Sequence, residues 1–316
     1  MFKTVDEAIH FIESQRAKRS FEDFQKIIER YQIPIDLKNV IHVAGTNGKG
    51  STVTFIKDLL MKQGYHVGTF TSPYIIKHHE RISVDGKPIS DDDLLRFINQ
   101  LLPLIQQEHL SMFEIDTLIM LYYFNELDLD YHIIECGIGG LHDKTNVIKS
   151  NVAVITNIGY DHQFMLGDTL LEIAHHKVGI VKENVPLFTT EQNKEILSYF
   201  KDYCTKHQST FYPLQVEKQY QYPYHLHFHQ KEYVLHLPTY QVSNLTLALN
   251  VVDYLCDLND EDIQAVIDDF KWPCRFEQFG HLYLDGAHNI SGIEALIQTI
   301  KERKLEDVGI VFSFDG

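Results

Sequence analysis

Residues 40–52, V-I-H-V-A-G-T-N-G-K-G-S-T, constrain the fold more than any other stretch of the chain. A short apolar run leads into glycines, a lysine and two hydroxyls, and helical spacing follows until Gly64. A strand, a glycine turn and a helix in this order point backbone N–H groups and a helix N-terminus at one place, where phosphate binds. The loop departs from the common G-x-x-x-x-G-K-[ST] pattern, because Val43 takes the first position and Gly50 follows Lys49. The residues alone leave two interpretations, a nucleotide-binding loop with a different sequence pattern or a tight strand-to-helix turn.

Strand-like and helical segments alternate around this loop. Strands are predicted at residues 40–44, 65–71, 131–140 and 151–159. The last two are continuous apolar runs, which are typical of buried parallel strands. Helical spacing predicts helices at residues 5–15, 21–31, 51–64, 113–127, 242–255 and 260–270, and another after the N-cap Ser90. This alternation predicts an α/β fold with a mostly parallel sheet flanked by helices.

The pattern changes between Pro186 and about Pro238. Tyrosine-rich alternation there predicts antiparallel strands at the edge of the main domain. Within it, H-L-H-F-H at residues 225–229 alternates as the exposed face of a strand would, with a metal site as the alternative reading. After Pro273, the sequence predicts a strand at 281–286, a helix at 290–303 and a last strand at 308–314.

Composition narrows the class of function. The chain has 28 Lys and Arg against 44 Asp and Glu, a formal net charge of −16, which argues against nucleic acid or an acidic membrane as a partner. A small anionic ligand is still compatible, because a local lysine or a bound Mg²⁺ reverses the sign within one pocket. No apolar run approaches the roughly 18 residues of a membrane span, and the N-terminus does not look like a signal peptide. Together with four widely spaced cysteines, Cys136, Cys204, Cys256 and Cys274, this predicts a cytoplasmic chain with reduced thiols.

The loop V-A-G-T-N-G-K-G-S-T resembles that of the Mur ligase superfamily, and most closely its folylpolyglutamate and dihydrofolate synthases. Further blocks match this branch in order at residues 72–86 (S-P-Y with H-E-R-I-S-V-D-G), 135–147 (E-C-G-I-G-G-L-H-D-K-T-N-V), 156–182 and 273–289 (P-C-R-F-E with D-G-A-H-N). The resemblance implies a P-loop-type Mur ligase central domain over residues 1–278. It also implies the beginning of a Rossmann-like C-terminal domain over residues 279–316.

The resemblance implies an ATP-dependent ligase that adds L-glutamate to folate through an acyl phosphate. The expected activity is that of a folylpolyglutamate synthase, with dihydrofolate synthase activity as a second option and tetrahydrofolate or dihydropteroate as the acceptor. All the reactants are anionic, so positioning and cation clamping should dominate catalysis. Two Mg²⁺ ions suit that need, and the enzyme is expected to be a monomer.

Site residues follow from the same resemblance. The implied catalytic residues are Lys49, His162 and Lys177. The first Mg²⁺ would be held by Ser51, Ser72 and Glu135, and the second by Glu135, His162 and a carbamoylated Lys177, since an unmodified lysine would repel the ion. The implied ATP-binding residues are Gly45, Thr46, Asn47, Gly48, Lys49, Gly50, Ser51, Thr52, Asn244, Arg275, Asp285, His288 and Asn289. The implied substrate-binding residues are Ser72, Pro73, Arg81, Asp143 and Asn146.

Each of these residues also has a structural reading. Glu135 lies in an apolar strand, where an ionised carboxylate needs a partner, and this favours a ligand role. Lys177 on a helix would read as a surface residue without the resemblance. Asp143 and Asn146 fit a substrate loop and a simple turn equally well. Asp285 and Asn289 also suit an Asx turn followed by a helix N-cap.

The match has departures. Leu141, His176, Cys274 and Ile290 differ from the family pattern, and Leu141 makes dihydrofolate synthase activity the less expected of the two. The sequence stops at Gly316, soon after the C-terminal domain would begin, so we expect this chain to lack most of that domain and to be poorly active. Two other functions compete with the main one, a peptidoglycan-type Mur ligase and a non-catalytic nucleotide-binding relative. The H-E-R-I loop argues against the first.

Overall fold

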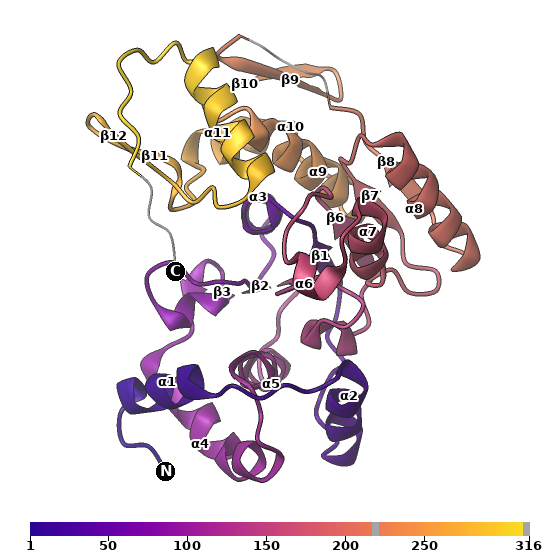
Figure 1. The fold of residues 1–316 in the computed structure, drawn as a ribbon, viewed down its shortest axis with the longest axis vertical. Coiled ribbons are helices and arrows are strands. Elements are labelled where there is room, and N and C mark those ends of the chain that lie inside the picture. Colours follow the sequence, from indigo (N-terminus) through magenta and orange to yellow (C-terminus); the bar gives the residue numbers. More distant parts are fainter. Residues whose placement is uncertain (217–220, 312–316) are drawn as a thin grey trace.

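The computed structural model describes residues 1–216 and 221–311, and its centre is one eight-stranded sheet (Figure 1). The order across the sheet is β4 (Lys87–Pro88), β3 (Ile82–Val84), β2 (Val67–Phe70), β5 (Tyr131–Glu135), β1 (Val40–Ala44), β6 (Val152–Ile155), β7 (Leu187–Thr189) and β8 (Phe211–Pro213). Neighbours from β2 to β8 pair in parallel, and β3 pairs antiparallel with both β2 and β4. The predicted mostly parallel α/β fold is therefore confirmed.

Helices cover both faces of the sheet. The helices α3 (Lys49–Lys62), α9 (Tyr240–Leu255) and α10 (Asp260–Asp269) cover one face of the sheet. They share an apolar core with the residues of β1 and β6 that point to this face. The opposite face packs on α1 (Val5–Ser14), α2 (Phe21–Arg30), α4 (Asp91–Glu108), α5 (Met112–Asn125), α7 (Leu170–Val178) and α8 (Lys194–Lys206). Every residue of β1 is buried, as expected of a central strand that is covered on both sides. This double cover holds the end of β1, and hence the glycine loop, in a fixed place.

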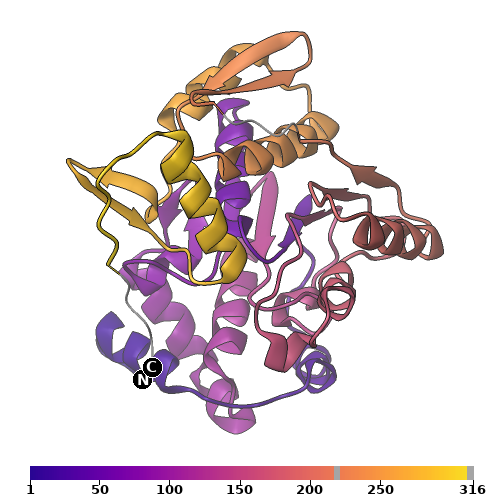
Figure 2. The same ribbon diagram turned by 45° about the horizontal axis from the view of Figure 1, so that its top comes forward.

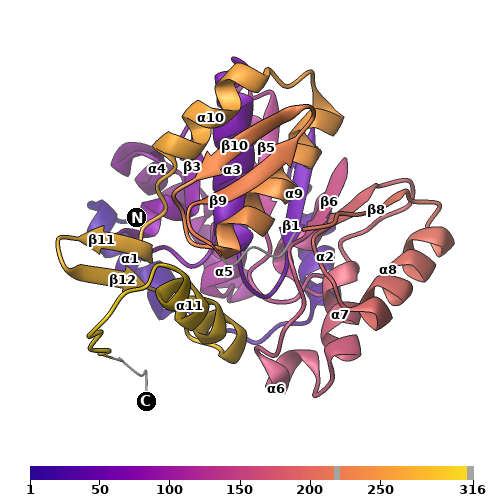
Figure 3. The ribbon, with the colours of Figure 1, turned by 90° about the horizontal axis from the view of Figure 1, so that it is seen from above.

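The prediction of antiparallel strands between Pro186 and Pro238 is wrong in part. The strands β7 and β8 run parallel to β6 within the main sheet, and the helix α8 connects them. Asn193 caps that helix, since its side chain accepts the Glu195 and Ile196 N–H groups. Among the described residues between Pro186 and Pro238, only β9 (Tyr224–Phe228) and β10 (Lys231–Leu235) pair in antiparallel fashion. They form a separate two-stranded sheet above α3 (Figure 3).

The histidine-rich strand has the predicted orientation. In β9 the side chains of Tyr224 and Leu226 are buried, while His225 and His227 are exposed. Both of these histidines lie within 3.4 Å of the Glu232 carboxylate on β10. The surface-strand reading of this segment is therefore confirmed.

The last elements lie beside the end of the sheet that carries the glycine loop (Figure 2). The strand β11 (Arg275–Phe279) pairs with β12 (Leu282–Asp285), and α11 (Ile290–Glu302) follows. The predicted domain boundary between residues 278 and 279 falls inside β11. The predicted strand at 308–314 is not formed at 308–311, and residues 312–314 lie outside the described part of the chain. None of the described helices combines the length and apolarity that a membrane span requires.

Three short helices complete the described structure. They are η1 (His78–Arg81), η2 (Lys144–Val147) and α6 (Gln163–Leu166). Each lies in a connection that follows a strand of the main sheet, so these connections gather at the same edge as the glycine loop.

Candidate active site

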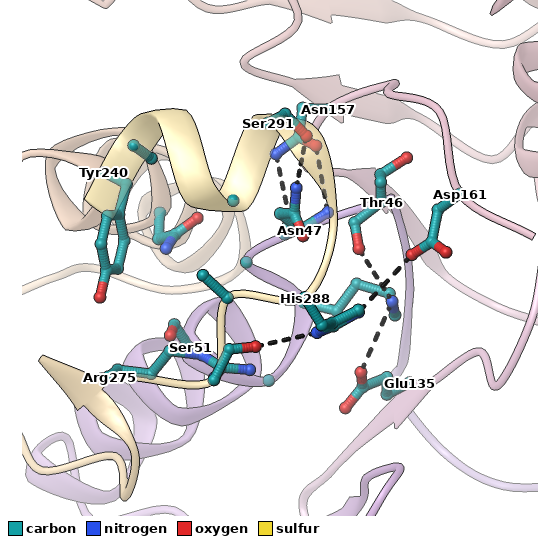
Figure 4. Close-up of a pocket in the computed structure, with 18 of the residues that line it drawn as sticks. Thr46, Asn47, Ser51, Glu135, Asn157, Asp161, Tyr240, Arg275, His288 and Ser291 are labelled. Atoms are coloured by element: carbon teal, nitrogen blue, oxygen red, sulfur yellow. Dashed lines mark hydrogen bonds and ion pairs between the residues drawn. The ribbon is translucent and has the colours of Figure 1, made fainter. Parts of the chain in front are cut away.

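A cavity of about 300 Å³ lies where the glycine loop, the ends of β5 and β6, and the N-terminus of α11 meet (Figure 4). Its walls come from residues 46–51, from Ser72, Pro73 and Glu135, from Asp161 and His162, and from residues 240–244 and 285–295 in part. Ligands of parallel α/β sheets bind at this place, outside the carboxyl ends of the strands. Segments more than 200 residues apart in the sequence therefore build one site.

The glycine loop turns sharply because two of its glycines have positive φ. Gly48, at φ 83°, caps α3, and a Cβ there would lie 2.2 Å from Asn244 Oδ1. Gly45, at φ 148°, passes so close to Thr156 that a side chain could not fit. The Lys49 ammonium donates to the carbonyls of Gly45 (3.2 Å) and Thr46 (3.4 Å), so its charge lies beside the loop. A helix N-terminus with a lysine beside it forms an anion site.

Gly48→Ala tests whether this close approach matters. We expect the variant to bind ATP at least about tenfold more weakly, because the methyl group adds a clash with Asn244 to the αL strain of roughly 1–2 kcal/mol. Gly64→Ala is the matched control, since Gly64 has φ 87° but nothing within 4 Å of the added Cβ. Thermal unfolding and ATP titration of both variants separate strain from contact. Equal ATP affinity in the two variants would contradict the prediction.

Glu135 is a buried carboxylate that faces the Lys49 ammonium without a short ion pair. Burial raises its pKa from 4.5 to about 7, although Lys49 Nζ, 4.0 Å from Oε1, and the backbone N–H of Ser72, 3.3 Å from Oε2, oppose the shift. The Ser51 hydroxyl, which is also buried, accepts a hydrogen bond from Gln241 Nε2 at 3.1 Å. A carboxylate and serine hydroxyls are the hard oxygen donors that Mg²⁺ prefers. A divalent cation therefore fits this corner of the cavity.

Lys177 is buried, although its sequence pattern alone predicts a surface residue. Only 3% of the residue is exposed, and Nζ donates to the Gly45 carbonyl at 2.8 Å. Burial, assisted by the charge of Lys49, lowers its pKa from 10.5 to about 7. The shift favours the neutral amine relative to an exposed lysine, and a neutral amine is the form that reacts with CO₂.

His162 stands at the edge of the same cavity. It precedes α6 with φ 48°, and its side chain is 40% exposed. Burial lowers its pKa, while Asp161, 3.8 Å from Nε2, raises it. A neutral imidazole is the form that binds a metal.

The opposite wall carries the other cations. Arg275 Nη1 donates to the Cys274 carbonyl at 3.0 Å, and among the described residues the guanidinium has no ion-pair partner. The pKa of His288 is raised, chiefly by its hydrogen bond to Asp161. Asp285 is held by Tyr240, whose hydroxyl donates to Oδ2 at 2.9 Å. The cavity thus presents positive groups from both walls.

Some predicted residues lie away from the cavity. Arg81 sits in a buried cluster, where its Nε is 3.5 Å from Asp116 Oδ2. Asp143 accepts the Ile138 backbone N–H at 2.9 Å, and the Asn146 side chain donates to the Leu141 carbonyl at 3.0 Å. These two side chains hold the loop after β5 in its conformation. Thr52 is also enclosed, and its hydroxyl has no hydrogen-bond partner within the described structure.

Ten cavity residues escaped the sequence predictions, among them Ser243 and four further polar residues. These four are Asn157, Asp161, Tyr240 and Ser291. Asn157 and Asp161 lie in the block 156–182 that already matched, so their positions offered a signal. Tyr240 and Ser291 act through partners that no sequence spacing reveals.

Comparison with known proteins agrees with this geometry. The Mur ligase middle domain family matches residues 43–252. A dihydrofolate synthase/folylpolyglutamate synthase of Bacillus subtilis is 36% identical over 317 residues, which cover 92% of this chain and 74% of the relative. A solved complex of folylpolyglutamate synthase with AMPPCP and folate superposes with a TM-score of 0.84 at 28% identity, covering 95% of this chain and 80% of the other. A bifunctional folylpolyglutamate synthase/dihydrofolate synthase with Mn, AMPPNP and L-glutamate gives 0.81 at 26% identity, covering 95% and 75%.

Proposed function

Because this chain belongs to the Mur ligase family, in the branch of folylpolyglutamate and dihydrofolate synthases, we propose that its cavity joins L-glutamate to a folate with ATP. One observation carries the proposal, the buried carboxylate of Glu135 facing Lys49 across a glycine loop that caps a helix. This arrangement suits a triphosphate with its cation. The solved relatives contain ATP analogues, a divalent metal, folate and L-glutamate, which supports the same ligands here.

The reaction transfers the γ-phosphoryl group of ATP to a carboxylate oxygen of the folate. The amine of L-glutamate then attacks the carbonyl carbon of this acyl phosphate, and phosphate leaves as the amide forms. Lys49 and the backbone N–H groups at the start of α3 hold the phosphates, while Arg275 and His288 face them from the other wall. These fixed positive groups oppose the repulsion among three anionic reactants.

The donor set supports two cations. Ser51, Ser72 and Glu135 would hold one, and Glu135, His162 and carbamoylated Lys177 the other. When bound, Mg²⁺ neutralises phosphate charge and acts as a Lewis acid on the transferred group. Carbamoylation joins the neutral Lys177 amine to CO₂ with loss of a proton, which turns the side chain into an anionic oxygen ligand. The pKa of about 7 supports this, because the amine is available at neutral pH.

The acceptor would approach along Ser72 and Pro73, which line the cavity. Arg81, Asp143 and Asn146 would act through the loops they hold. We assign residues 1–278 to the ATP-binding domain and residues 279–316 to the second domain, because β12 and α11 form the opposite wall. We propose that the enzyme acts as a monomer.

Incorporation of radiolabelled L-glutamate tests the function. We expect Mg²⁺- and ATP-dependent labelling of tetrahydrofolate, with phosphate released in equal amount. Dihydropteroate in its place tests the dihydrofolate synthase activity. ATP binding without labelled product from any folate acceptor would contradict the proposal.

A further inference from the structure

We propose that Asn47 and Asn289 are positioning residues that act through each other. Their side-chain amides clasp the glycine loop to the first turn of α11, and this Asn47–Asn289 clasp holds α11 across the cavity. The sequence resemblance assigns both residues to contact with ATP, whereas the structure pairs them with each other. The inference rests on the nucleotide binding proposed above.

The clasp is a reciprocal pair of hydrogen bonds. Asn47 Nδ2 donates to Asn289 Oδ1 at 3.1 Å, and Asn289 Nδ2 donates to Asn47 Oδ1 at 3.0 Å. Ser291 joins it, since its hydroxyl accepts a second hydrogen bond from Asn47 Nδ2 at 2.8 Å (Figure 4). The two asparagines are 242 positions apart in the sequence. The contact therefore exists only because the fold brings α11 to the loop.

The side chain of Asn47 is directed at α11 because its backbone is fixed from the other side. Asn157 Oδ1 accepts the Asn47 N–H at 3.1 Å, and Asn157 Nδ2 donates to the Asn47 carbonyl at 2.9 Å. The Thr156 hydroxyl donates to the same carbonyl at 2.6 Å. Three hydrogen bonds from the end of β6 thus set the peptide units on both sides of the Asn47 side chain.

Both amide groups already have protein partners for their donors. A side-chain amide carries two N–H donors. Those of Asn47 go to Asn289 and Ser291, and those of Asn289 go to Asn47 and to Asp161 Oδ2 at 3.2 Å. Asn289 Oδ1 also accepts the Gly292 N–H at 2.9 Å, which caps α11. A hydrogen bond donated by either amide to a phosphate of ATP would have to break one of these bonds, so the pairing is the better account of both residues.

The other end of α11 is held independently. The Tyr224 hydroxyl donates to Glu302, and the Arg303 guanidinium lies over the Tyr222 ring at 4.5 Å. Residues of the first turns of α11, Ser291, Gly292 and Ala295, line the cavity. Without the clasp, α11 keeps its attachment at its C-terminal end, while its cavity-lining end loses its hydrogen bonds to the glycine loop. The clasp thus determines whether the wall formed by α11 is in place for the nucleotide.

Asn289→Ser is the sharpest test, because serine keeps an N-cap oxygen but lacks the amide donors. Asn47→Ala breaks the clasp from the loop side. The matched control is Asn193→Ser, the same change at the N-cap of α8. The Asn193 Oδ1 accepts the Glu195 and Ile196 N–H groups away from the cavity. Two measurements apply to each variant. The first is hydrogen exchange of α11 amides without nucleotide, and the second is the Kd of AMPPCP with Mg²⁺.

The Kd can be followed through the fluorescence of Trp272, the only tryptophan, whose ring packs on Gly50. We expect each single clasp variant to speed hydrogen exchange in the first turn of α11 at least fivefold. We also expect each to weaken the binding of AMPPCP about tenfold, which corresponds to the loss of roughly one or two neutral hydrogen bonds. The double variant should bind AMPPCP no more weakly than the single variant with the lower affinity, because the two residues share one contact. The control should speed exchange only in α8.

The clasp would be overturned if the loss of AMPPCP affinity in the double variant equalled the product of the two single losses while exchange in α11 stayed unchanged. That result would show two independent contacts with ATP. Should Asn289→Ser fail to fold, Asn47→Ala gives the same two readouts from the other side. A wild-type protein that incorporates no glutamate would contradict the proposed function alone. The exchange of α11 would still decide the clasp.

Discussion

Glu135→Gln is expected to lower glutamate ligation about a thousandfold. The substitution keeps the size of the side chain but removes the anionic oxygen that both proposed cation sites share, and losses of this order follow when one strong electrostatic contact to the reacting groups is removed. Initial rates of labelled glutamate incorporation at saturating ATP and folate give the measurement. A rate within tenfold of the wild type would contradict the role of this carboxylate.

The same variant is expected to be more stable than the wild type when Mg²⁺ is chelated. Because burial raises the folded-state pKa of Glu135 from 4.5 to about 7, the folded protein binds more protons than the unfolded chain within that window. Wild-type stability therefore falls as the pH rises from 4.5 to about 7, by up to about 3 kcal/mol. Glutamine removes this dependence, so the gain should be largest at pH 8. Denaturant unfolding at pH 5 and pH 8 measures it.

Glu114→Gln provides the matched control. Glu114 is also fully buried, but Arg19 Nε and Lys144 Nζ each lie 3.4 Å from its Oε1. Removing that charge leaves two cations without their partner, so this variant should be destabilised at both pH values. If both glutamine variants shifted stability in the same direction at pH 8, the link between the Glu135 pKa and stability would be wrong.

Lys177→Ala is expected to reduce ligation by about a hundredfold or more while leaving ATP affinity within a few-fold of the wild type. The side chain is proposed to act as a carbamate ligand of the second cation, whereas the phosphates lie on the glycine loop. Wild-type protein depleted of CO₂ should lose activity and regain it with bicarbonate. Wild-type turnover in Lys177→Ala would contradict the carbamate.

Lys182→Ala is the control for this variant. Lys182 is a partly buried lysine in the same matched block. Neither lysine lines the cavity, but Lys177 Nζ donates to the Gly45 carbonyl of the glycine loop, whereas Lys182 Nζ donates to the Gly179 carbonyl at 3.4 Å. Carbon-13 NMR with labelled bicarbonate should show one carbamate signal that is lost in Lys177→Ala and kept in Lys182→Ala.

The folded-state pKa of Lys177 is lowered from 10.5 to about 7, so the folded protein binds fewer protons than the unfolded chain within that window. CO₂-free protein should therefore gain stability as the pH rises from about 7 to 10.5, and Lys177→Met should abolish the gain.

The sequence was most informative where the structure is local. The order of strand, glycine loop and helix at residues 40–64 placed β1 and α3 because the signals lie within one short segment. The edge of the sheet after Pro186 was misread, since three-residue strands such as β7 carry too little pattern to show their direction. Direction is set by the crossover through α8, which is a tertiary property.

The candidate site divides in the same way. Glu135 stood out because a carboxylate in an apolar strand is unusual in itself. The partner of Ser51 did not, since Gln241 is 190 positions away and looks like any polar residue of a helix. The burial of Lys177 was equally hidden, because the residue contacts a carbonyl of a loop 132 positions earlier. Such contacts arise from the docking of finished elements.

The position of α11 has a consequence for the order of assembly. The glycine loop is complete at residue 52, and the central sheet closes with β8 at residue 213, yet the facing wall arrives only with residues 285–295. A chain emerging from a ribosome would form its scaffold well before it could retain a nucleotide, because contacts of such sequence separation form late. Nucleotide retention would then mark a molecule in which α11 has docked.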